Sequence, residues 1–253
     1  MSQGGLALAS VRYAFGRGDR AVLDEITLQV PTGGVLVVRG PNGSGKTTLL
    51  RLAAGILRPA SGTVQRPRPV GYQPQVAGEP PPRTAAGSWL TTIVRMRGHT
   101  DGAVGIGLLE QLGVRPELPL AACSRGTLAK VLVAAALAGP PELVVLDEPF
   151  AALDDAARST AAAMVRRAAD DGGSVLLADH SEHLDVLGAR TVQLRDGRLV
   201  EWAAPQGPPT WRLVTVGPDG VEQVRIVARA DRDRTLLDVL RAGGEVRRVE
   251  RWP

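Results

Sequence analysis

Residues 35–48 read VLVVRGPNGSGKTT, and this stretch decides how the chain folds. The apolar run at 35–39 is typical of a strand buried on both faces of a parallel sheet. A glycine-rich turn at 40–45 follows it, and residues 49–57 (LLRLAAGIL) continue as a helix that Pro59 and the Ser-Gly pair at 61–62 stop. The stretch therefore predicts a strand, a tight loop and a helix in direct succession.

The loop between this strand and helix fits the spacing of a phosphate-binding loop, G-x-x-x-x-G-K-[ST], at Gly40, Gly45, Lys46 and Thr47. Glycines let successive backbone N–H groups turn inward around phosphate oxygens, and the following helix adds its positive end. We expect Lys46 to reach the β- and γ-phosphates and the Thr47 hydroxyl to hold Mg²⁺. The loop thus predicts a site for a nucleotide and its magnesium ion.

A second motif, LVVLDEP at 143–149, places two carboxylates after another apolar run. Ligands of open α/β sheets bind beyond the carboxyl ends of the parallel strands, which is where these side chains would lie. Asp147 is expected to coordinate Mg²⁺, directly or through water. Glu148 is expected to accept the proton of an attacking water, a role that no neutral side chain fills.

Composition limits the class of protein. The 253 residues favour one domain with a small appendage, and 44% hydrophobic residues are enough for a sizeable core. The net charge is only +4 and the arginines alternate with acids, so no nucleic-acid partner is expected. Cys123 is the only cysteine, which rules out an internal disulfide. We find no signal peptide, and the apolar runs fall short of the ~20 residues that span a bilayer, so a soluble chain is expected.

The remaining segments complete an α/β pattern. Proline and glycine are frequent at 76–122, which also holds amphipathic pieces, so this region predicts a helical insertion. Residues 205–209 (PQGPP) mark a boundary, after which the chain reads as strand, turn, strand, helix at 233–242 and strand at 245–250. This tail is either a regulatory or dimer-contacting module or a cap on the sheet edge. Further strands are predicted at 6–12, 22–30, 70–75 and 174–178, a helix at 154–170, and a hairpin around Asp196-Gly197.

The stretch CSRGTLAK at 123–130 precedes an alanine-rich helical run that ends at Gly139-Pro140. Ser124 is a favourable helix N-cap, so the stretch is at least a capped helix start. A helix N-terminus with a serine hydroxyl and a nearby glycine also attracts anions. The sequence therefore allows both a structural and a ligand-binding role here.

Taken together, the motifs resemble the nucleotide-binding subunit of an ATP-binding cassette (ABC) transporter, over roughly residues 6–203. They appear in the order of that family: phosphate loop, glutamine loop in YQPQ, signature at CSRGT, Walker B strand LVVLDEP, D-loop in AALDD and switch histidine in LLADHSEH. The signature departs from the usual Leu-Ser-Gly-Gly-Gln, because Arg125 replaces the first glycine and Thr127 the glutamine. A Ser-(Arg or Lys)-Gly core is similar to the variants of type-2 ABC exporter subunits.

The resemblance implies a fold with an antiparallel β subdomain, a RecA-like parallel-sheet core and a helical subdomain at about 76–135. These form an ABC ATPase domain over 1–203, with a small α+β extension over 204–253. It implies ATP and Mg²⁺ as cofactors. The implied catalytic residues are Glu148, His180 and Lys46, and the implied metal ligands are Thr47, Gln75 and Asp147. The implied nucleotide contacts are Phe15, Gly40, Pro41, Asn42, Gly43, Ser44, Gly45, Lys46, Thr47, Thr48, Gln75, Ser124, Gly126 and Asp154.

Two of these assignments have a runner-up. Phe15 is the better match to the ring that stacks on adenine, with Tyr13 as the alternative. Gln75 is the better match to the glutamine that senses Mg²⁺ and the membrane partner, with Gln73 as the alternative.

The resemblance also implies a function. We expect an ATPase subunit that works as a homodimer or heterodimer on integral membrane permease subunits, at the inner face of the membrane, with export as the expected direction. One alternative is a soluble ABC-type ATPase acting on a ribosome or nucleic acid. Such relatives usually carry two cassettes or long insertions, which this chain lacks. A second alternative is a P-loop kinase, and the signature and switch-histidine motifs argue against that class.

Overall fold

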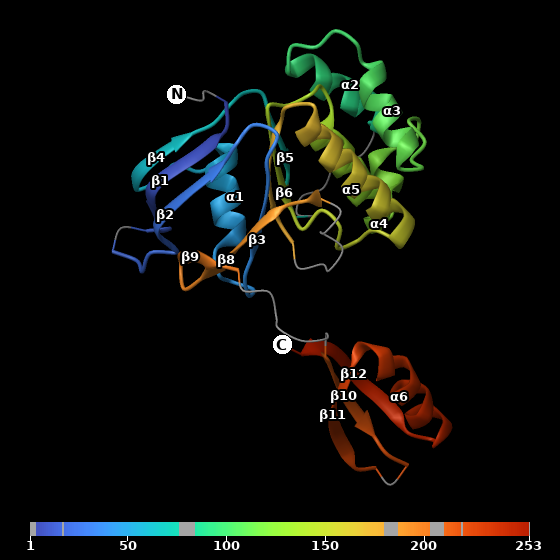
Figure 1. Cartoon of the computed structure of the whole chain (residues 1–253). Helices are drawn as coiled ribbons and strands as arrows, with labels where there is room; N and C mark the ends of the chain where they lie inside the picture. Colours follow the sequence, from blue (N-terminus) through green and yellow to red (C-terminus); the bar gives the residue numbers. More distant parts are fainter. Residues whose placement is uncertain are drawn as a thin grey trace. The chain divides into compact units, whose positions relative to one another are not determined.

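The structure is a computed structural model that describes residues 4–16, 18–75, 84–179, 187–202, 210–218 and 220–252. The chain forms two compact units, Met1–Trp202 and Ala203–Pro253. The first unit contains two sheets and several helices, and the second contains one sheet and one helix (Figure 1). Each unit is described by itself below.

A six-stranded sheet forms the centre of the first unit, in the order β5-β6-β7-β3-β8-β9. All neighbouring strands are parallel except β8 and β9, which form the predicted hairpin. The strands are β3 (Val35–Arg39), β5 (Val70–Gln73), β6 (Leu143–Asp147), β7 (Ser174–Ala178), β8 (Arg190–Arg195) and β9 (Arg198–Glu201).

Both faces of this sheet are covered, as the continuous apolar runs predict. Val35 and Val37 of β3 face a core shared with α4 (Arg125–Leu137) and α5 (Asp155–Asp170). The residues between them, Leu36 and Val38, face a second core that includes α1 (Lys46–Ala54). The three central strands, β3, β6 and β7, therefore have no solvent-exposed face.

A three-stranded antiparallel sheet, β2-β1-β4, completes the second core. Its strands are β1 (Leu6–Tyr13), β2 (Leu23–Val30) and β4 (Ser61–Gln65). Strand β4 was not predicted from the sequence, and α1 ends at Ala54, three residues before the predicted end, because Gly55 caps it in a left-handed conformation (φ 83°). Because β4 is an edge strand with mostly exposed side chains, it needs no apolar run. Gly62, at φ 83°, fits its position because a Cβ there would lie 2.4 Å from the Ser10 carbonyl oxygen.

The insertion is helical, with α2 (Ala86–Met96) and α3 (Ala103–Gln111) packed against α4. The three consecutive prolines at 80–82 lie outside the described residues. One side chain fastens this segment together: the Arg97 guanidinium, at the end of α2, donates to the carbonyl oxygens of Ala135 (3.0 Å), Ala136 (3.3 Å) and Ala138. Arg97 therefore satisfies carbonyl groups that the C-terminus of α4 leaves without intrahelical donors.

The second unit is a sheet of order β11-β10-β12 with one helix. The predicted succession of elements is present, but the helix begins at Arg229, directly after the second strand, and not at 233. The elements are β10 (Thr210–Val216), β11 (Glu222–Ala228), α6 (Arg229–Arg241) and β12 (Glu245–Trp252).

We expect Arg97→Met to lower the free energy of unfolding of the first unit by about 2 kcal/mol, because buried carbonyl groups would lose a charged donor. Urea denaturation followed by circular dichroism measures this. Arg95→Met is the matched control, since Arg95 is exposed on the same helix. Equal stability of the two variants would contradict the capping role.

Candidate active site

The phosphate loop joins β3 to α1 and takes its shape from glycine. Gly40, Gly43 and Gly45 have φ values of 155°, 79° and 101°, which disfavour other residues. A Cβ on Gly40 would lie 2.3 Å from the carbonyl oxygen of Leu194 and 2.8 Å from Ser44 Oγ. Because Gly40 has no side chain, the start of this cradle-shaped loop can pass close to the Leu194 carbonyl group of β8, where a Cβ would clash.

Lys46 is the first residue of α1 and folds back over this cradle. Its ammonium donates to the carbonyl oxygens of Gly40 (2.7 Å) and Pro41 (3.0 Å), and the side chain is 7% exposed. Burial lowers the pKa of Lys46, while the charges of Glu148 and Asp147 act in the opposite direction. The loop carbonyls thus hold a cation at the place where phosphate oxygens would need one.

Asp147 ends β6 and is 1% exposed. The pKa of its carboxyl group is raised, chiefly by burial and also by the negative charge of Glu148. A hydrogen bond from Thr47 and the positive charge of Lys46 act in the opposite direction. Its Oδ2 atom is buried and accepts no hydrogen bond from the described residues. A buried carboxylate oxygen beside a hydroxyl matches the hard oxygen ligands of Mg²⁺, so the residues present fit that ion.

Glu148 follows in a left-handed conformation, with φ 50°, and its backbone N–H donates to the Ala178 carbonyl of β7 (2.9 Å). Its carboxylate accepts a hydrogen bond from Gln75 Nε2 at 2.9 Å. Gln73, by contrast, is 2% exposed and donates to the Asp147 carbonyl oxygen (3.3 Å). The structure therefore brings Gln75, and not Gln73, to the carboxylate that sequence reasoning assigned to catalysis.

The signature stretch forms the N-terminus of α4. Ser124 is the N-cap, and its Oγ accepts from the Thr127 N–H (3.1 Å) and lies 2.8 Å from the Thr127 hydroxyl oxygen. A Cβ on Gly126 would lie 3.1 Å from the Ala152 carbonyl oxygen, so the helix start packs closely on the D-loop. Ser124 and Arg125 are exposed.

Asp154 links this helix to α5. One carboxylate oxygen accepts from the Ala157 N–H (2.8 Å) and caps α5, and the other lies 3.2 Å from Lys130 Nζ of α4. The backbone hydrogen bond from Ala157 and then Lys130 hold the pKa of Asp154 below its usual range. The basic residue of the signature stretch and the aspartate of the D-loop are thus direct partners.

Two predicted residues lie away from this cluster. Phe15 is 69% exposed and contacts only the Tyr13 ring among its described ring partners, edge to face at 5.3 Å between centroids. The structure therefore does not separate the two candidates for the adenine contact. His180 and His183 lie outside the described residues.

Sequence reasoning missed Arg51, which lies on α1 near the carboxylates. Burial raises the pKa values of Asp147 and Tyr72, and Arg51 lowers both. The signal was available, because Arg51 follows Thr47 by one helical turn and so shares its face. Arg51 supports the negative charge on Asp147 that metal binding requires.

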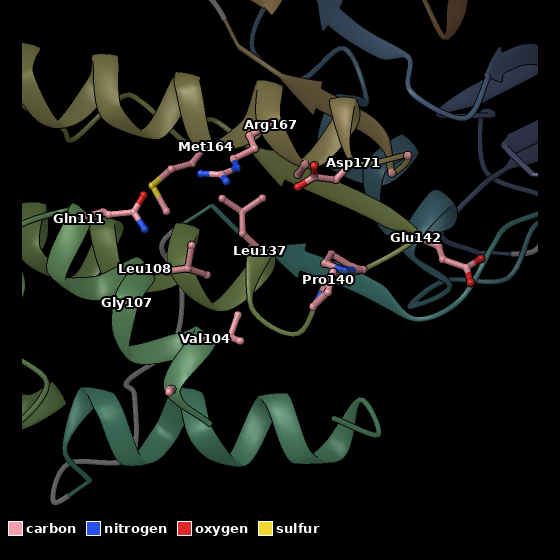
Figure 2. Close-up of a pocket in the computed structure, with 15 residues that line it drawn as sticks. Val104, Gly107, Leu108, Gln111, Leu137, Pro140, Glu142, Met164, Arg167 and Asp171 are labelled. Atoms are coloured by element: carbon pink, nitrogen blue, oxygen red, sulfur yellow. The ribbon is translucent and has the colours of Figure 1, made fainter. Parts of the chain in front are cut away.

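A pocket of about 500 Å³ lies elsewhere, between α3 and the C-terminal half of α5 (Figure 2). Leu108, Leu137 and Met164 contribute apolar walls, and Arg167 and Asp171 contribute charge. Glu142 lies at its edge, directly before β6, whereas the carboxylates follow the other end of that strand. This pocket is therefore separate from the phosphate loop.

The sequence model of the family described as ABC transporter matches residues 23–151, the part that holds the phosphate loop, the carboxylates and the signature. The chain belongs to the ABC transporter family. It is an ATP-binding subunit with ATPase activity that uses ATP and Mg²⁺. The family assignment made from the sequence is confirmed.

Relatives and solved structures agree with this. The chain is 37% identical over 168 residues to the cytochrome c biogenesis ATP-binding export protein CcmA of Sphingopyxis alaskensis, covering 65% of this chain and 84% of the relative. It is 34% identical over 185 residues to the zinc import ATP-binding protein ZnuC of Pseudomonas fluorescens, covering 71% and 68%. The dimeric structure of the bacterial ABC transporter cassette MJ0796 has a TM-score of 0.71 at 20% identity and covers 80% of this chain and 99% of that one. Such structures confirm the predicted fold.

No helix within the described part of the chain has the length and apolar character needed to cross a membrane.

We expect Mg²⁺ binding to the ATP-loaded protein to weaken as pH falls through the raised pKa of Asp147, because the protonated carboxyl group is a poor ligand. The loss should begin at higher pH than for an ordinary aspartate. Arg51→Met removes a charge that lowers this pKa, so the loss should begin at a higher pH than in the parent. Calorimetric Mg²⁺ titrations across pH test this, with the exposed Arg58→Met as control. Identical profiles for the Arg51 variant and the parent would be inconsistent with this role.

Proposed function

We propose that the chain drives transport of a substrate across a membrane through separate permease subunits, as one of two paired cassettes. The observation that carries the proposal is the pair Asp147 and Glu148, held at the same sheet edge as the phosphate loop and linked to Gln75. ATP hydrolysis needs these two carboxylates. Coupling to a partner protein needs a residue that contacts the carboxylates from a different segment of the chain. Gln75 lies at the start of the helical insertion and donates to Glu148, so it links the insertion to the catalytic carboxylate.

Each site residue then has a task. The backbone from Gly40 to Thr48 and the Lys46 ammonium bind the phosphates, and Thr47 and Asp147 hold Mg²⁺, with Gln75 beside them. Glu148 accepts the proton of the attacking water, while Gln75 fixes its carboxylate. Phe15 stacks on adenine, and His180 contacts the γ-phosphate. Mg²⁺, when bound, neutralises charge on the phosphate oxygens.

The second cassette supplies the rest of the site. Ser124 and Arg125, at the start of α4, are exposed, and helix N-termini bind anions. In the proposed dimer Ser124 and Gly126 close over the partner's γ-phosphate, and Asp154 lies at the interface. The solved dimer of the MJ0796 cassette supports pairing of this kind.

For the direction of transport we propose export. The CcmA relative, described as an export protein, is matched over 84% of its length, and the Ser-Arg-Gly signature resembles exporter variants. Import is the second candidate, because several zinc import ATP-binding proteins are 33–40% identical. In either case the cassette would sit at the inner face of the membrane, on its permease.

Glu148→Gln tests the catalytic assignment. We expect ATP binding to persist, the turnover rate to fall by about 10²- to 10⁴-fold, and an ATP-bound dimer to accumulate, because the water loses its proton acceptor. Phosphate release and size-exclusion chromatography with ATP measure this. Glu142→Gln is the matched control, since Glu142 is exposed beside the other end of the same strand. Parental turnover in Glu148→Gln would remove this residue from catalysis.

A mixing experiment tests whether the signature serves the partner. Lys46→Ala should weaken ATP affinity about tenfold or more, and Ser124→Arg should leave ATP binding intact but block hydrolysis. In a mixed dimer one site carries both changes and the other carries none. Combining the two inactive variants, in the complex with the permease, should therefore restore ATPase activity. Full activity of Ser124→Arg alone would refute the shared site.

A further inference from the structure

The sheet of the C-terminal unit has two faces, and α6 covers only one. Successive side chains of a strand point to opposite faces of the sheet. Trp211, Leu213 and Thr215 of β10 therefore share one face, and Arg212, Val214 and Val216 share the other. The direct antiparallel partner of each residue lies on the same face as that residue. The Arg232 guanidinium of α6 lies 4.6 Å from the Trp211 ring centroid, and Leu213 is fully buried. Helix α6 therefore packs on the Trp211 face. Figure 1 shows α6 lying along the sheet of this unit.

The face that α6 leaves uncovered is apolar at its centre. The register places Val214 beside Val224, and Arg212 beside Ile226. Val224 and Ile226 are 51% and 55% exposed, while Val214, directly opposite Val224, is 9% exposed. We call Val214, Val224 and Ile226 the open face.

This unit has a small core. Among its described residues only Leu213, Val214 and Thr215 are buried. Domains of roughly this size have marginal stability, and a disulfide, a metal ion or association with a partner often adds to it. The only cysteine of the chain is Cys123, and no group of described His, Cys, Asp and Glu side chains is placed to hold a metal. Association is a further means, and the open face is one of the surfaces where exposed apolar side chains could be buried; Leu237 and Leu240 of α6 form another.

The charges around the open face favour a copy of itself. The register places Glu222 and Glu245 beside Val216 at one end, Arg248 beside Val214 near the centre, and Arg212 beside Ile226 toward the other end. A surface of mixed sign does not attract nucleic acid or an anionic membrane, both of which select clustered cations. A second copy presents the same apolar centre and the same two signs, so it can pair with them.

We propose that the C-terminal units of two chains pack against each other through their open faces. Three strands of this length cover roughly 300 Å², well below the ~800 Å² that each partner contributes in an independent complex. The contact therefore needs a tether. Residues 203–209 join each unit to a cassette, and the inference rests on the cassette dimer proposed above, which raises the effective concentration of the two units.

Sedimentation of the full chain tests the contact, in the Glu148→Gln background with ATP. Val224→Asp should weaken dimerisation about tenfold or more, because the interface would bury two carboxylates. Leu237→Asp is the matched control: Leu237 is also 51% exposed but lies on α6, so its variant should dimerise like the parent. Equal effects of the two variants, or none, would overturn the proposal.

Crosslinking keeps the test independent of folding of the Asp variant. In a Cys123→Ala background, Val224→Cys should form a covalent dimer with a short bis-maleimide, because facing sheets lie about 10 Å apart. Leu237→Cys should not. A dimeric parent with no Val224 crosslink would refute the open-face contact and leave the cassette dimer standing. A parent that stays monomeric with ATP would refute the cassette dimer, and the tethered contact with it.

Discussion

The position of Ala178 between two strands is the constraint on which the active site depends. Ala178 ends β7, and its register partners are Val38 of β3 on one side and Asp147 of β6 on the other. Its carbonyl oxygen also accepts the backbone N–H of Glu148. One small, fully buried residue thus sets the spacing between the phosphate loop and the carboxylates. Both neighbours of β7, the strands β3 and β6, are packed on both faces. A shift in register of either strand would move its side chains out of the positions in which they are packed.

The charges at this edge are held in place but are incompletely satisfied. The Lys46 ammonium is occupied by loop carbonyl oxygens, which are weaker partners than phosphate oxygens. Two buried oxygen atoms, Asp147 Oδ2 and Ser44 Oγ, have no hydrogen-bond partner among the described residues. Leaving polar atoms in this state costs free energy. Nucleotide and metal binding would relieve that cost, so the site favours the loaded form before any closure occurs.

Features that depend on a local sequence pattern could be predicted from the sequence, whereas features that depend on contacts between distant segments could not. Strands β3, β6 and β7 were predicted to the residue because strands buried on both faces require unbroken apolar runs. Ser124 was identified as a cap from local chemistry alone. The edge strand β4 has no such signature. The Arg97 clip could not be predicted either, because it joins residues 38 to 41 positions apart and only packing brings them together. The site residues were found through motif order, whereas Arg51 belongs to no motif.

The Arg97 clip also gives α4 a mechanical character. It holds the C-terminal end of the helix to α2, while Ser124 lies at the opposite end, about 20 Å away for a helix of this length. Near the clip, α4 touches β5 so closely that a Cβ on Gly71 would lie 1.9 Å from the Ala136 carbonyl oxygen. The C-terminal end of α4 is therefore held both to α2 and to β5, whereas Ser124 lies at the end farthest from these two attachments. For a given change in the direction of the helix, the signature would move farther than the attached end.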